Sequence, residues 1–92
     1  MKNIEINNVK YEVIRNDKSC INEEELSEKI TDYFENYDYI VGDFSYDKVR
    51  LKGYYEKTNK KATEINDISN IEHYIKEYCS YGARIFIIKK VK

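Results

Sequence analysis

The run Ile85-Phe86-Ile87-Ile88, inside the segment Arg84–Val91, decides the fold of this 92-residue chain. Four consecutive apolar residues indicate a strand that is covered on both faces, because a strand with one solvated face alternates apolar and polar side chains. We therefore expect the last segment of the chain to be a central strand, with the other elements arranged around it.

Two helices are predicted ahead of this strand. The later one covers about residues 69–80, where Ser69 and Glu72 have the spacing of a capping box, and Asp67 is an alternative cap. The earlier one begins at Asn22, with a glutamate three residues later. Apolar residues at helical spacing mark the buried stripe of each helix: Leu26, Ile30, Tyr33, Phe34 and Tyr37 in the first, and Ile71, Tyr74, Ile75 and Tyr78 in the second.

Four further strands are predicted from side-chain alternation. An opening hairpin spans about residues 4–13, with its turn at Asn7-Asn8, because Asn tolerates the positive φ of a tight turn. Two more strands cover residues 38–44 and 49–57. The predicted order is ββαββαβ, which defines an α+β fold: one domain over residues 1–92, with two helices and about five strands in a mostly antiparallel sheet.

The charge of the chain is divided unequally between its halves. The net charge is −1, but residues 1–46 carry −6 and residues 47–92 carry +5. Cations that gather on one face attract an anionic partner even when the net charge is near zero. The alternative is that elements of opposite sign simply lie beside each other.

The composition also indicates a compartment. No apolar run approaches the ~18 residues of a membrane span, and the N-terminal residues lack the apolar stretch of a signal peptide. Small secreted domains usually hold several disulfides, whereas this chain has only Cys20 and Cys79, without a CxxC motif. We expect a cytoplasmic protein that does not associate with membranes and whose cysteines are buried or half-buried thiols.

Several blocks of the sequence resemble the YutD-like family of small bacterial proteins. They are Tyr37-Asp38-Tyr39-Ile40-Val41-Gly42-Asp43, Arg50-Leu51-Lys52-Gly53-Tyr54 and Asn59-Lys60-Lys61-Ala62, followed by Tyr74, Glu77-Tyr78-Cys79, Gly82, Phe86 and Lys89-Lys90. The resemblance covers about residues 36–91, and more loosely the opening hairpin and the first helix. It implies a compact cytoplasmic α+β protein, and it supplies no catalytic residues.

The sequence offers few candidates for catalysis or metal binding. His73, the only histidine, lies on the solvent side of the later helix. Asp38 and Asp43 are five residues apart, so in an extended strand their side chains point to opposite faces and cannot share an ion. We expect Asp43 to be a turn or strand-end residue whose carboxylate accepts backbone N–H groups. We therefore predict no catalytic residues, no metal site and no cofactor.

The most specific functional signal is a basic face on the strand that begins near Val49. Alternation turns Val49 and Leu51 inward and the residues between them toward water. Lysines continue in the loop that follows, at residues 57–61. The candidate binding residues are Lys48, Arg50, Lys52, Tyr54, Lys60 and Lys61.

Three functions remain open at this level. The first is a non-enzymatic binding or regulatory module that acts through a protein partner, as the small size and tyrosine-rich composition favour. The second is RNA or single-stranded DNA binding through the basic strand, because cations neutralise phosphates while an exposed ring stacks on a base. The third is an enzyme that uses His73 or the aspartates. The basic strand also has a purely protective interpretation, since lysines on an edge strand prevent edge-to-edge aggregation.

Overall fold

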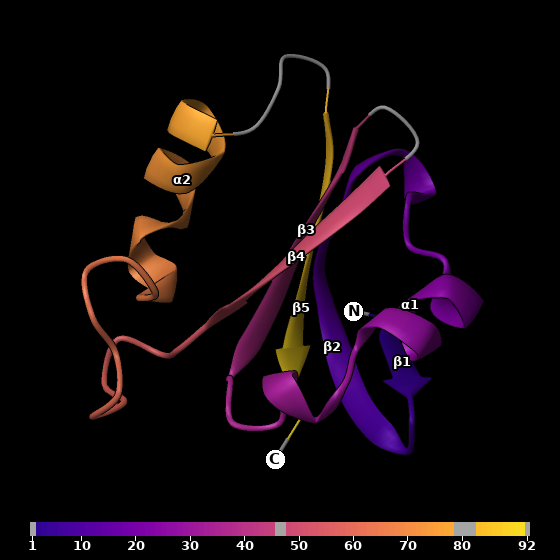
Figure 1. Ribbon diagram of the computed structural model, residues 1–92, viewed down its shortest axis with the longest axis horizontal. Coiled ribbons are helices and arrows are strands. Elements are labelled where there is room, and N and C mark those ends of the chain that lie inside the picture. The colour runs from indigo at the N-terminus through magenta and orange to yellow at the C-terminus, as the bar shows by residue number, and fades with distance from the viewer. Residues whose placement is uncertain (1, 46–47, 79–82, 92) are drawn as a thin grey trace.

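Five strands form one sheet in the computed structural model, which describes residues 2–45, 48–78 and 83–91 (Figure 1). The strands are β1 (Asn3–Ile6), β2 (Val9–Asn16), β3 (Tyr39–Ser45), β4 (Lys48–Tyr54) and β5 (Arg84–Lys90). Their order is β1-β2-β5-β3-β4, and each neighbouring pair is antiparallel. The α+β class and the central position of the last strand are confirmed.

A helical layer lies on each face of this sheet (Figure 1). α1 (Glu23–Lys29) packs on one face and α2 (Ile71–Tyr78) on the other. The last strand serves both layers, because Phe86 and Ile88 belong to the core under α1, whereas Ile85 and Ile87 belong to the core under α2. This double burial explains why β5 is apolar at four consecutive positions.

The first helix is shorter than the apolar spacing predicts. It ends just before Ile30, whose backbone is extended with φ −83° and ψ 105°. The side-chain amide of Asn7, in the opening hairpin, donates hydrogen bonds of 3.0 Å to the carbonyls of Ser27 and Ile30. These carbonyls are thus satisfied without another helical turn. The chain then forms the separate 3₁₀ turn Asp32–Phe34, in which Phe34 is buried but Tyr33 is 67% exposed, so the prediction of a buried Tyr33 is wrong.

The turn and cap signals are confirmed in part. Asn7 and Asn8 have φ of 52° and 68°, as a tight hairpin turn requires, and Asn22 accepts a hydrogen bond from the amide three residues later. At the other helix the cap is Asp67 and not Ser69. The Asp67 carboxylate accepts a 2.9 Å hydrogen bond from the Ser69 amide and starts the 3₁₀ turn Ile68–Asn70 that leads into α2.

Two strands differ in length from their predictions. β4 ends at Tyr54 and not at Lys57, because the next residue, Tyr55, turns to form a single parallel bridge with Asp67. β2 continues to Asn16, with an irregularity in its pairing to β5 after Val13. The longer β2 gives the central strand a partner along most of its length.

Candidate functional site

The predicted alternation along β4 is present. Lys48 and Arg50 are exposed and Lys52 is half-buried, whereas Val49 and Leu51 pack against the core under α1 on the opposite face. We call Lys48, Arg50 and Lys52 the cationic face of β4. It lies on the same side of the sheet as α2, since Lys52 contacts Tyr74 of α2, and β4 is an edge strand of the sheet.

Arg50 is held in place by a buried carboxylate. It lies directly across from Asp43 on β3, and its guanidinium donates to both carboxylate oxygens, with Nε 3.1 Å from each. The Asp43 side chain is only 2% exposed, while that of Arg50 is 58% exposed. Asp43 is therefore an interior residue of β3, and the prediction of a turn or strand-end residue is wrong. A buried carboxylate needs a charged partner, and this one fixes the position of an exposed cation.

Tyr54 is the clearest error among the predicted site residues. It points to the same side as the cations, as alternation requires, but it is 1% exposed and belongs to the core under α2. Its ring contacts that of Tyr74 edge to face at 6.0 Å, because α2 covers this end of the strand. A ring buried in this way offers no surface on which a base can stack.

Lys52 is positioned by these two rings. Its ammonium lies 4.9 Å from the centre of the Tyr54 ring and 4.5 Å from that of Tyr74. Such contacts hold a cation over the aromatic faces and bury its aliphatic stem. The sequence places Tyr74 on the apolar stripe of the later helix. The contact with Lys52 could not be predicted from this stripe alone, because it requires that α2 packs over β4.

A pocket of about 360 Å³ opens beside Lys52, between β4 and α2. Its lining residues are Lys52, Tyr54, Glu64, Ile65, Asn70, His73 and Tyr74. Ile65 is 75% exposed at the rim, and His73 is exposed on α2, as predicted. The pocket therefore combines the apolar side chain of Ile65 and two tyrosine rings with polar groups of both charges.

The lysines of the following loop are exposed, and Asp38 fixes the start of this loop. Lys60 and Lys61 are both exposed. The Asp38 carboxylate, 5% exposed as a residue, accepts hydrogen bonds from the Glu56 amide at 2.8 Å and from the Asn59 side chain at 3.0 Å. Asp38, which was predicted to begin a strand, thus connects the basic loop to the beginning of β3.

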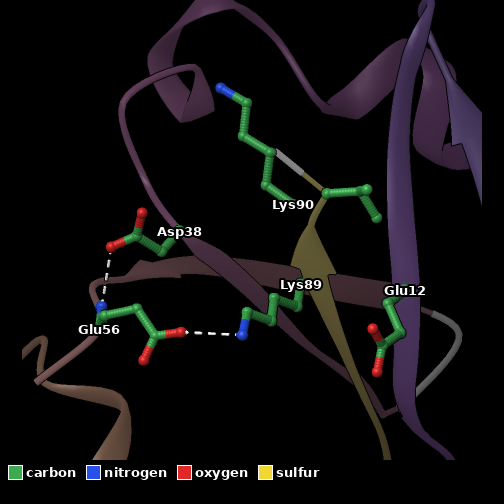
Figure 2. Close-up of a pocket in the computed structure, with 6 residues that line it drawn as sticks. Glu12, Asp38, Glu56, Lys89 and Lys90 are labelled. Atoms are coloured by element: carbon green, nitrogen blue, oxygen red, sulfur yellow. Dashed lines mark hydrogen bonds and ion pairs between the residues drawn. The ribbon is translucent and has the colours of Figure 1, made fainter.

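A second pocket, of about 350 Å³, lies next to this anchor, and Figure 2 shows it. Glu56 faces Lys89 across it, with 3.1 Å between the carboxylate and the ammonium, and accepts a 2.9 Å hydrogen bond from the Tyr39 hydroxyl. Burial raises the pKa of Tyr39, and the contact with Glu56 raises the pKa of Lys89. The pair of Glu56 and Lys89 thus connects the loop after β4 to β5, and Glu12 of β2 also lines this pocket.

The other candidate groups lie apart from one another. Among residues 2–45, 48–78 and 83–91, no three His, Cys, Asp or Glu side chains converge as a metal ion requires. Cys20 is half-buried and burial raises the pKa of its thiol, which lowers its reactivity. The prediction for Cys79 lies outside the described residues. In the described part of the chain, neither α1 nor α2 has the length and apolarity to cross a membrane.

Comparisons with known proteins agree with this fold. Residues 5–89 match the family described as "Putative antitoxin YutD-like", and the chain belongs to this family. A relative is the protein named "Putative antitoxin YutD" of Bacillus subtilis (strain 168), which is 40% identical over 87 residues, 95% of this chain and 96% of that protein. The solution NMR structure of protein yutD from B. subtilis superposes with a TM-score of 0.78 at 39% identity, covering all of this chain and 84% of the other. The resemblance seen in the sequence is thus confirmed.

Proposed function

We propose that this protein is a non-enzymatic binding module that acts in the cytoplasm by binding a protein partner, in the manner of an antitoxin. The name of the B. subtilis relative, "Putative antitoxin YutD", supports this class of function, because an antitoxin acts by contact with another molecule. The observation that carries the proposal is the cationic face of β4, where Asp43 and the tyrosine rings hold two cations in fixed positions at the edge of the sheet. Pre-positioned side chains lose little entropy when a partner binds.

Photo-crosslinking in cells of the source organism tests this function. A photoreactive residue is placed, one position at a time, at exposed sites around the molecule: Lys2, Lys10, Lys29, Lys48 and Lys61. We expect the variant at Lys48 to yield one discrete protein adduct, and the purified adduct partner to bind the unmodified chain at a fixed stoichiometry. Absence of any discrete protein adduct from all five positions would contradict the proposal.

A second candidate is binding of RNA or single-stranded DNA through the same cations with Lys60 and Lys61. The exposure of Lys48, Arg50 and both loop lysines favours it, whereas the burial of Tyr54 removes the stacking surface that it called for. Fluorescence anisotropy with a labelled single-stranded oligonucleotide distinguishes it, because phosphate contacts make affinity fall steeply with salt. Binding of the oligonucleotide at low salt that Lys60→Glu and Lys61→Glu abolish would support this candidate, and unchanged anisotropy at low salt would exclude it.

A further inference from the structure

The outer edge of β4 is long and open. β4 is the last strand of the sheet and pairs with β3 through all seven of its residues. Within the described residues, no strand pairs with its other side between Lys48 and Tyr54. The opposite edge of the sheet, β1, has only four residues. An open edge presents unpaired N–H and C=O groups, to which an extended segment can add as a further strand.

The chain itself already uses the continuation of this edge. At Tyr55, immediately after β4, the amide donates to the carbonyl of Asn66 at 2.7 Å, and the carbonyl accepts from the amide of Ile68 at 2.9 Å. These bonds make the parallel bridge between Tyr55 and Asp67. The backbone is therefore oriented for pairing on this side, and the chain's own segment forms its bridge just past the end of β4.

The side chains along the edge define what can pair there. On one face stand the cations Lys48, Arg50 and Lys52, and on the other stand Val49 and Leu51, which are half-buried and in contact with the core under α1. A strand added to this edge would continue both faces. It would place one set of its side chains beside the cations and the alternate set beside Val49 and Leu51.

A second copy of the chain does not fit this edge. If two β4 strands paired antiparallel about Arg50, each Arg50 would face its equivalent and each Lys48 would face the Lys52 of the other copy. Like charges directly opposite each other destabilise a strand pair. Charge complementarity instead requires carboxylates at these positions.

We propose that β4 binds its partner by strand addition, and that the partner segment is extended and alternates acidic with apolar residues. This inference rests on the proposed function and specifies how the partner is recognised. The acidic side chains pair with the cationic face of β4, and the apolar ones cover Val49 and Leu51. Neither the fold nor the contacts Asp43–Arg50 and Lys52–Tyr74 need to change for the segment to bind.

Peptides of the length of β4 test the mode directly on the full-length chain. One peptide alternates Glu with Val, and a matched peptide alternates Lys with Val. We expect the acidic peptide to bind and to shift the NMR amide signals of residues 48–54, while those of β1 stay unchanged, and the basic peptide not to bind. Binding of neither peptide, or shifts elsewhere than β4, would overturn strand addition.

Charge reversal provides the matched control. Lys48→Glu should weaken binding of the acidic peptide by about threefold to tenfold, the effect of exchanging an attractive for a repulsive cross-strand pair. The same reversal at Lys2, exposed at the far edge, should leave binding unchanged. Equal effects of the two variants would overturn the mode. A protein adduct found from other positions but not from Lys48 would do the same, while it would leave the proposed function in place.

Discussion

At the scale of single residues, two glycines let aromatic rings approach the backbone of the sheet closely. A Cβ on Gly42 would stand 2.1 Å from the ring of Phe86, its neighbour on β5, and one on Gly53 would stand 2.3 Å from the ring of Tyr37. Both contacts lie on the α1 side, where Phe86 is fully buried and Tyr37 covers the end of β4. Glycine is thus required by close approach of a side chain and not by backbone conformation.

Gly53→Ala should therefore destabilise the protein by about 1–3 kcal/mol, the usual cost of overpacking. The methyl group would displace the Tyr37 ring, which also packs on Tyr55 with ring centres 4.8 Å apart. Urea unfolding followed by circular dichroism measures the change. Thr58→Ala, at an exposed loop position, serves as the control, and equal midpoints for the two variants would contradict this account.

At the scale of elements, Asp38 connects three parts of the chain. Its backbone amide donates to the Tyr54 carbonyl, its carbonyl accepts from the Lys90 amide, and its carboxylate holds the loop at Glu56 and Asn59. The beginning of β3, the end of β4 and the end of β5 therefore meet at one residue. The basic loop is ordered by this residue and not by its own turn residues alone.

Asp38→Ala should free this loop and destabilise the fold by about 1–3 kcal/mol, because it leaves the Glu56 amide without its acceptor. Hydrogen exchange at that amide should accelerate in the variant. Glu28→Ala, exposed on α1, should change neither quantity. Unchanged exchange at Glu56 in Asp38→Ala would show that other contacts order the loop.

At the scale of the whole molecule, the central strand of the sheet is the last strand of the chain. β5 inserts between β2 and β3, which are separated in sequence by α1. Within the sheet, β5 therefore joins the hairpin of β1 and β2 to the hairpin of β3 and β4. Asp17 reinforces this joint, because its carboxylate accepts a 3.1 Å hydrogen bond from the Ile85 amide and pairs with Arg15 at 2.9 Å.

This carboxylate makes part of the stability dependent on pH. The hydrogen bond from Arg15 lowers the pKa of Asp17, with help from the Ile85 amide. A folded pKa below the unfolded value of about 3.9 stabilises the fold above that pH, and the contribution is lost as the pH falls through the folded pKa. Asp17→Asn should thus be less stable than the parent chain at neutral pH, and the urea midpoints of the two should converge as the pH falls through the folded pKa of Asp17. A constant difference across this range would contradict the assignment.

Much of the fold could be predicted from short stretches of the sequence. The four apolar residues of β5 predict its central place, the asparagines predict the hairpin turn and the first cap, and the alternation in β4 gives the direction of each side chain. The errors at Tyr33 and Tyr54 have a different origin. Both residues fit the local pattern on which their predictions rested, but their exposure depends on elements that are distant in the sequence. Asn7 of the hairpin caps the end of α1, so the helix stops before Tyr33. Tyr54 is buried because α2 covers it.

The sequence by itself therefore determined the elements, their order along the chain and which side chains share a strand face, because these follow from backbone periodicity and capping within a few residues. Only the tertiary structure decided that Asp43 holds Arg50, that Lys52 lies over two rings, and that the edge of β4 stays open. The physical reason is that burial and pairing depend on contacts between segments far apart in the chain, such as Asp38 with Glu56 or β4 with α2, which no local pattern encodes.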